Sequence, residues 1–256
     1  MNTKSIVTQA ICLSSSDYQD YDRLVKLFSV DYGIITARFK SVKKSGAKLK
    51  MSSEVFCLAE YTLIRKGDNT DFYQVIGANI IDSFFESTKR YEQFTMSNAL
   101  LEMTLKSLPE KTPLAKIYIN LLKSLKAICY EGKHSVYVVC HYMCYLLDFL
   151  GYKLNFLYCA NCNEKLTEKI YFDFEKGSFL CHKCNEYGKY TDKDFIKFLN
   201  LVAKTPLADS NLVNFEQLNL KPILSFLTED LQQKVDKNIL SIKNYLEFLE
   251  YFQKNS

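Results

Sequence analysis

The sequence contains no tryptophan and few residues that interrupt regular structure, with 8 glycines and 4 prolines among 256 residues. Long stretches therefore lack strong helix-breaking signals, which favours helices over much of the chain. Histidine is also scarce, at 3 residues, so metal hydrolases and catalytic triads lose their commonest participant. Hydrophobic residues make up 48% of the chain and aromatics 14%. We therefore expect one or two globular domains with a substantial core, helical over much of their length.

Long apolar runs are absent as well. No stretch approaches the roughly 18–20 residues that span a bilayer, and polar residues interrupt the N-terminus too early for a signal-peptide core. We expect a cytoplasmic protein without membrane contact. Nine cysteines in such a chain cannot all form disulfides, because the number is odd and the compartment is reducing. Metal binding or burial must account for them.

Common catalytic motifs are missing. The chain contains no G-x-x-x-x-G-K-[ST] loop, no G-x-G-x-x-G after a strand, no H-E-x-x-H and no G-x-S-x-G. A formal net charge of +4 is too small to identify a partner. A non-enzymatic protein is the favoured hypothesis. The alternatives are a nuclease that uses carboxylates and magnesium, and a helical adaptor that binds another protein.

The first eighty residues favour β structure. Residues 5–13, 34–40, 54–64 and 71–81 are short, rich in β-branched and aromatic residues, and separated by polar or glycine-containing turns. Residues 22–28 suit an extended segment, although their apolar spacing also suits a helical turn. Four or five such strands predict a small barrel or sandwich.

The pattern changes to helical after Ile81, with apolar residues three and four positions apart. We expect helices over 91–108, 113–131, 135–150, 192–204, 222–235 and 239–253. The last has an apolar stripe of only two heptads, too short for a coiled-coil assignment, so we interpret it as a bundle helix.

Two C-x-x-C pairs form the most specific motif. Cys159 and Cys162 are separated from Cys181 and Cys184 by 18 residues, a spacing typical of a four-cysteine zinc site. One tight turn can direct two sulfurs at a single point, and two turns complete a tetrahedron. Four sulfurs close the coordination shell, so we predict one structural zinc ion without a catalytic role. The simpler alternative is four buried thiols.

The surroundings of these pairs predict a ribbon-like unit. Residues 168–174 and 178–180 suit the two strands of a hairpin. Asn163 and Asn185 follow the two pairs, and asparagine tolerates the left-handed conformation that tight turns need. Lysines that can offset the thiolate charge are Lys165, Lys169, Lys176 and Lys183.

Other candidate ligands have simpler explanations. His182 lies inside the second pair and is an alternative ligand, but the cysteines beside it have the proper spacing. Cys140, His141 and Cys144 lie in an apolar segment typical of a buried helix. We assign these three residues to the core.

A basic segment at residues 36–53 contains six positive and no acidic residues. Ser41, Ser45 and Gly46 predict a flexible centre, which suits a loop that follows a phosphate backbone. A solvated loop with no partner is the alternative. The candidate nucleic-acid contacts, including two after the next strand, are Arg38, Lys40, Lys43, Lys44, Lys48, Lys50, Arg65 and Lys66.

Aromatic side chains on the predicted strands are a second candidate for nucleic-acid contact. An exposed subset would stack on unpaired bases, although we expect more of them to pack in the core. They are Phe39, Phe56, Tyr61, Phe72 and Tyr73.

Together these features resemble the RecO family. The resemblance spans nearly the whole chain, and its most specific parts are the stretch from Asp22 to Phe28 followed by Gly33, the basic segment ending at Lys50, and Leu150-Gly151-Tyr152 leading into the cysteine pairs. It implies an α+β protein with an N-terminal OB-fold β-barrel over 1–81 and a helical domain over 82–256, into which a four-cysteine zinc subdomain is inserted at 157–188.

The resemblance also implies a function. Members of the family act in bacterial recombinational DNA repair, in the cytoplasm and at the nucleoid, and are not enzymes. They bind single- and double-stranded DNA, anneal complementary strands, and work with RecR to load RecA on strands covered by single-strand-binding protein. The lysine and arginine cluster then becomes a DNA-contact surface. Some members lack the four cysteines, which implies that the metal supports the fold and not DNA binding.

Overall fold

The computed structural model describes residues 5–65, 72–167, 169–185, 187–191, 193–212 and 219–255. The chain folds as two compact units. The first contains Met1–Phe94 and Leu101–Cys129, and the second contains Thr95–Leu100 and Tyr130–Ser256. No helix of the described residues is long and apolar enough to cross a membrane.

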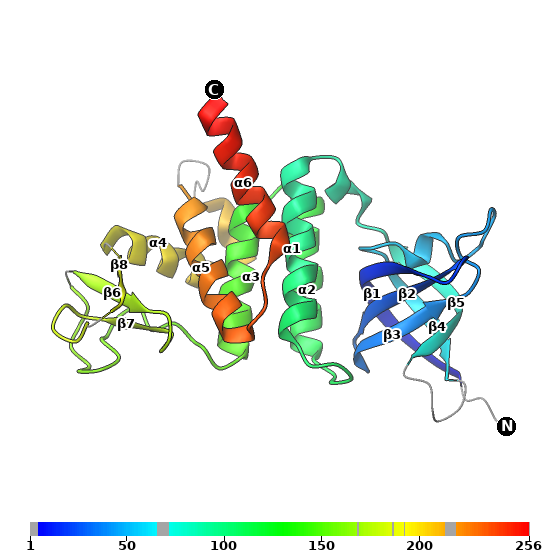
Figure 1. Cartoon of the computed structure of the whole chain (residues 1–256), viewed down its shortest axis with the longest axis horizontal. Helices are drawn as coiled ribbons and strands as arrows, with labels where there is room; N and C mark the ends of the chain where they lie inside the picture. Colours follow the sequence, from blue (N-terminus) through cyan, green and yellow to red (C-terminus); the bar gives the residue numbers. More distant parts are fainter. Residues whose placement is uncertain are drawn as a thin grey trace. The chain divides into compact units, whose positions relative to one another are not determined.

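Five strands close into a barrel in the first unit, in the order β1-β2-β3-β5-β4 (Figure 1). Their bounds are Ser5–Tyr18 (β1), Asp22–Ser29 (β2), Gly33–Phe39 (β3), Leu58–Ile64 (β4) and Tyr73–Asp82 (β5). All pairs are antiparallel except β3 with β5. This is the five-stranded OB-fold arrangement, so the expected N-terminal fold is confirmed, and the extended interpretation of residues 22–28 is correct.

Two boundaries differ from the prediction. Strand β1 continues through Ser14–Ser16 to Tyr18, because it pairs with β2 as far as Tyr18 and Asp22 after an irregularity at Cys12. Residues 54–57 form turns instead of the start of β4, and Phe56 adopts a left-handed φ of 74°. Cys12 N still donates to Cys57 O at 2.9 Å, so a kinked connection continues the pairing to β1.

Inward-facing side chains of all five strands fill the barrel. Phe39 and Tyr61 are fully buried and pack edge to face with ring centroids 6.0 Å apart. Phe56 is also buried, whereas Phe72 and Tyr73 are half-buried. Most of the candidate stacking aromatics therefore belong to the core, as expected.

Helix α2 (Ala115–Cys129) joins the barrel through the edge of β3. Ile34 forms a parallel bridge with Glu110, and Lys111 N donates to Ile34 O at 2.9 Å. Phe28 packs on Tyr118 with ring centroids 5.5 Å apart. Hydrogen bonds and aromatic packing thus hold the barrel and α2 in one body.

Helix α1 (Tyr91–Ser107) contributes residues to both units. The second unit contains helices α3 (Ser135–Phe149), α4 (Lys193–Lys204), α5 (Lys221–Val235) and α6 (Leu240–Asn255) and strands β6 (Ile170–Asp173), β7 (Ser178–Leu180) and β8 (Lys189–Thr191). The predicted helices are confirmed to within a few residues, because their apolar spacing is regular. Strand β8 was not predicted.

Helix α3 lies at the centre of the second unit and packs against α4 and α5. Cys140 is completely buried, His141 and Cys144 lie on the same helix, and neither residue belongs to a metal-ligand group of the described residues. The assignment to the helix core is confirmed for Cys140, whereas His141 and Cys144 are half-buried and line a cavity beside α3. Ile239, directly before α6, and Ile242 within it are both fully buried. This burial is expected of a bundle helix.

A glycine makes the contact between barrel and α2 possible. Gly33 has φ +68°, and a Cβ at this position would overlap the backbone of Thr112. Gly46 has a similar φ of +72° but open space around it.

We expect Gly33→Ala to destabilise the protein more than Gly46→Ala does. The left-handed conformation costs alanine about 1–2 kcal/mol at either site, and forced displacement of Thr112 adds roughly 1–3 kcal/mol at Gly33 alone. Urea denaturation of both variants measures the difference. Equal losses of stability would show that the backbone contact between β3 and residues 110–112, which we call the seam, tolerates a side chain at position 33.

Candidate nucleic-acid interface and metal centre

The basic segment between β3 and β4 forms successive turns and not an open loop. Lys44 N, Ala47 N and Lys50 N each donate to the carbonyl three residues earlier, at 3.1–3.2 Å. Val42 is buried in the barrel core, and Leu49 packs against it. We expected a flexible centre, but residues 40–50 form an ordered cap on the barrel. Its apolar residues Val42 and Leu49 pack against the barrel core, and its lysines are exposed.

A buried carboxylate holds the beginning of this cap. Arg38 Nε donates to Asp22 Oδ2 at 2.6 Å, and Ser41 N donates to Asp22 Oδ1 at 2.7 Å. Burial opposes ionisation of Asp22, but these hydrogen bonds outweigh it and lower the pKa of its carboxyl below the ordinary value. Arg38 also lies over the ring of Tyr18, 5.3 Å from its centroid. The Arg38 guanidinium is thus engaged in contacts within the barrel that hold the start of the cap.

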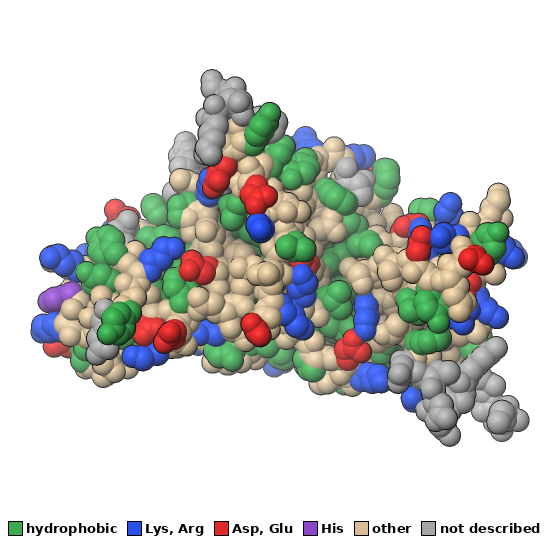
Figure 2. All heavy atoms as spheres, viewed as in Figure 1, with side chains coloured by type: hydrophobic (Ala, Val, Ile, Leu, Met, Phe, Trp, Pro, Cys, Tyr) green, Lys and Arg blue, Asp and Glu red, His purple; other side chains and the backbone are tan. Residues whose placement is uncertain are grey.

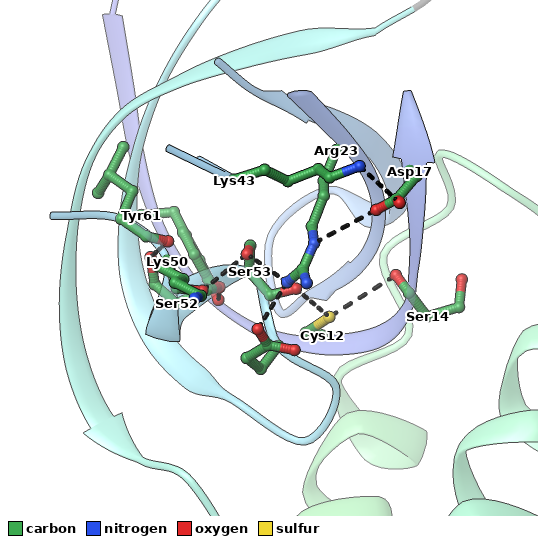
Figure 3. A network of polar contacts seen from close by, with 11 residues as sticks. Cys12, Ser14, Asp17, Arg23, Lys43, Lys50, Ser52, Ser53 and Tyr61 are labelled. Carbon is green, nitrogen blue, oxygen red and sulfur yellow. Dashed lines mark hydrogen bonds and ion pairs between the residues drawn. The ribbon is translucent and has the colours of Figure 1, made fainter. Parts of the chain in front are cut away.

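A second polar network holds the end of the cap (Figure 3). Arg23 Nη1 donates to Glu54 Oε1 at 2.6 Å and to Ser53 Oγ at 3.1 Å. Tyr61 OH donates to Ser52 O at 2.7 Å from inside the barrel. Figure 3 shows these groups converging on residues 50–54, where the cap turns toward β4.

The eight predicted contacts divide by their surroundings. Lys43 pairs with Asp17 at 2.7 Å, and Lys44 lies over the ring of Tyr21, 5.1 Å from its centroid. Figure 2 accordingly shows acidic and basic side chains intermixed on the barrel. Predicted contacts that are exposed and take part in no ion pair of the described residues are Lys40, Lys44, Lys48, Lys50 and Arg65.

Strand register places Arg65 directly after the end of β4. Ile64 pairs with Gln74 of β5, which pairs with Arg38 of β3, and Ile64 also pairs with Ser5 at the start of β1. Lys66 lies outside the described residues. Sequence reasoning missed the counter-charges Asp17 and Asp22, because they come from segments outside the basic stretch and only folding brings them near Lys43 and Arg38.

The four cysteines lie together in the second unit, with their sulfurs all within 4.8 Å of one another. Cys162 Sγ and Cys181 Sγ are 3.7 Å apart. Four sulfurs around one zinc ion, each at about 2.3 Å, lie about 3.8 Å from one another. The predicted ligands are thus positioned to bind a metal ion, and their number, chemistry and spacing fit zinc.

Each cysteine pair lies in a tight turn. Asn163 N donates to Cys159 O at 2.9 Å, and Asn163 has the expected left-handed φ of 58°. Cys184 N donates to Cys181 O at 3.1 Å. The prediction is wrong for Asn185, which is not among the left-handed residues of the described chain; its Oδ1 instead accepts from Gly188 N at 2.7 Å.

Backbone N–H groups favour the thiolate form of one of the four ligands, Cys159, whereas hydrogen bonding with Cys162 raises the pKa of Cys184 to about 12. Burial opposes ionisation of Cys159, but N–H groups of Cys162, Cys181 and Asn161 outweigh it and lower the pKa of the Cys159 thiol to about 6. The expected lysine compensation is only partial. Lys183 and Lys176 pair with Glu164 and Asp173, at 3.3 and 3.5 Å.

An aromatic cluster fastens the cysteine-bearing ribbon to the helices of its unit. Phe226 of α5 lies with its ring centroid 4.7 Å from that of Phe172 and 6.0 Å from that of Phe179. Lys234 Nζ donates to Phe174 O at 3.0 Å from the same helix. The ribbon sheet, in the order β7-β6-β8, therefore packs on α5 along one face.

Two family models match the chain. "Recombination protein O N terminal" matches residues 1–84, which contain the barrel, and "Recombination protein O C terminal" matches residues 89–241. The second match includes the helices α1 to α5 and the four-cysteine group.

Similar proteins include three described as DNA repair protein RecO. The Clostridium novyi protein is 25% identical over 250 residues, 95% of each chain. The Caldicellulosiruptor bescii protein is 23% identical over 254 residues, 98% of this chain and 100% of its own. The Dehalococcoides mccartyi protein is 30% identical over 178 residues, 69% of each chain. With both family models matched along the barrel and the helices, the chain belongs to the RecO family of DNA repair proteins.

Proposed function

We propose that this protein is a non-catalytic recombination mediator that binds single- and double-stranded DNA, anneals complementary strands, and helps to load RecA on strands covered by single-strand-binding protein. The observation that supports it most is the cap at residues 40–50. Its apolar residues pack against the barrel core, and its lysines are exposed to solvent. An ordered surface with a fixed array of positive charge suits a phosphate backbone without base specificity.

The proposal assigns different roles to the basic residues. Lys40, Lys44, Lys48 and Lys50 would contact phosphates, together with Arg65 and Lys66 beyond β4. Arg38 and Lys43 would contribute less, because Asp22 and Asp17 neutralise much of their charge. We further propose residues 1–81 as the nucleic-acid-binding domain and 82–256 as the helical domain, with its zinc subdomain at 157–188.

The salt dependence of binding to a labelled oligonucleotide tests this assignment. Replacing Lys48 and Lys50 by Gln should reduce the slope of log affinity against log salt by about 1.4, since each phosphate contact on a single strand contributes about 0.7. Lys43→Gln should reduce it by less than one full contact, because Asp17 already balances that charge.

Lys197→Gln is the matched control, because this lysine is exposed on α4 and pairs with Asp194 at 2.9 Å. Its slope should equal that of the unaltered protein. A double variant with an unchanged slope would refute the cap as a DNA contact. The labelled strand should also remain intact with magnesium, and cleavage would favour the nuclease alternative.

We also propose that the metal is a single structural zinc ion. Cys162→Ser should remove it, as seen by native mass spectrometry, and lower the free energy of unfolding by several kcal/mol. Cys162 is exposed, so without metal its replacement should cost little. In chelator-treated protein the same substitution should have no further effect. A metal-free mass for the unaltered protein would contradict the assignment.

The proposed partners are RecR and single-strand-binding protein, and a cavity of about 480 Å³ beside α3 supports the second. Leu154, Phe156 and Leu157 are apolar residues of its lining, which also includes Lys153 and Lys204. Asp148 pairs with Lys153 at 3.0 Å, whereas no ion pair of the described residues includes Lys204. Such a cavity suits an acidic tail that carries an apolar side chain.

Lys204→Glu should weaken binding of the acidic tail peptide of single-strand-binding protein roughly tenfold, because a like charge replaces the attractive one. Lys197→Glu makes the same charge change on the same helix outside the cavity lining. Fluorescence anisotropy with a labelled peptide compares them. Equal affinities for the two variants would exclude this cavity as the tail site.

A further inference from the structure

Helix α2 carries an exposed face with positive charge and no negative charge. Its exposed positions include Lys116, Lys123 and Lys126, whereas Ile117, Leu121 and Leu125 face the protein interior. Spacings of seven and three residues keep the three lysines on one side of the helix. At 1.5 Å per residue they extend over about 15 Å.

These lysines differ from those on the other helices. Lys106 of α1 pairs with Glu102, Lys197 of α4 with Asp194, and Lys243 of α6 with Glu247. No ion pair of the described residues includes the three lysines of α2. The reason lies in the sequence, which has no Asp or Glu from Lys111 to Tyr130.

The lysine face belongs to the same body as the proposed DNA-binding cap. Phe28 of the barrel packs on Tyr118 of α2, and Ile34 O accepts a hydrogen bond from Lys111 N in the segment before the helix. The barrel and α2 form one compact unit. Basic side chains appear in Figure 2 in the region where Figure 1 shows α1 and α2. The cap and the lysine face of α2 therefore lie on the same compact unit.

We infer that Lys116, Lys123 and Lys126 of α2 form a second phosphate-binding surface for DNA, separate from the barrel cap. The inference rests on the proposed DNA-binding function and extends it. Unpaired lysines act as point charges toward phosphates and carry no base-reading geometry, so the surface takes the sugar–phosphate backbone of any sequence. Two such surfaces on one body suit a protein that holds two strands for annealing.

The test is a triple variant with Lys116, Lys123 and Lys126 changed to Gln, which keeps a similar helix propensity. Its salt slope for a long single strand should fall by about 2, the sum of three contacts of about 0.7 each. Combined with the Lys48→Gln and Lys50→Gln changes, the losses should add, because the two surfaces are separate. Strand annealing should slow in the triple variant.

A second triple variant, Lys106→Gln with Lys197→Gln and Lys243→Gln, makes the same change in net charge at ion-paired lysines and should keep the original slope. Thermal unfolding establishes that both variants fold. An unchanged slope in the α2 variant, while the unaltered protein and the cap variant behave as proposed, would overturn this inference alone. Equal slopes in the two triple variants would also overturn it, because net charge would then explain the effect. Absence of binding by the unaltered protein would refute the proposed function itself.

Discussion

The backbone contact between β3 and residues 110–112 fixes the geometry on which the functional surfaces depend. Strand β3 pairs with β5 only at Ala37 and Arg38, so the rest of its edge is open to another partner. Glu110 and Lys111 pair with that edge at Ile34 through backbone hydrogen bonding, and the missing side chain of Gly33 leaves room for the backbone of Thr112. Because of this backbone contact, the barrel is not joined to α2 by a flexible linker alone. The lysines of α2 and those of the cap therefore belong to one compact unit.

Counter-charges determine which cations remain for a ligand. Asp22 and Asp17 lie at the start of β2 and the end of β1, and their carboxylates engage Arg38 and Lys43. Composition identified the basic segment at 36–53 but not this division, since the partners lie outside it and approach only when β1, β2 and β3 pair. The contact between β3 and residues 110–112 could not be predicted either, because Gly33 and Thr112 are far apart in sequence and no local pattern links them.

Local patterns predicted much of the architecture. Short segments rich in β-branched and aromatic residues located the strands, three- and four-residue apolar spacing located the helices, and C-x-x-C spacing located the metal-ligand group. Strand β1 was predicted too short because Ser14–Ser16 lack β propensity, which pairing with β2 overrides. The aromatic anchor of the ribbon was missed because Phe226 lies more than forty residues from Phe172 and Phe179 in sequence. This anchor packs the ribbon on α5 within the second unit, and the proposed zinc ion would stabilise the same ribbon, apart from the proposed DNA surfaces of the first unit.

The most direct test of this separation is single-stranded DNA binding titrated against salt, before and after a chelator removes the metal. If the first unit binds phosphates and the metal serves the fold of the second, both titrations should give the same steep slope. Thermal stability alone should fall on metal removal. A slope that vanishes with the metal, or an affinity that does not depend on salt in either state, would contradict the account.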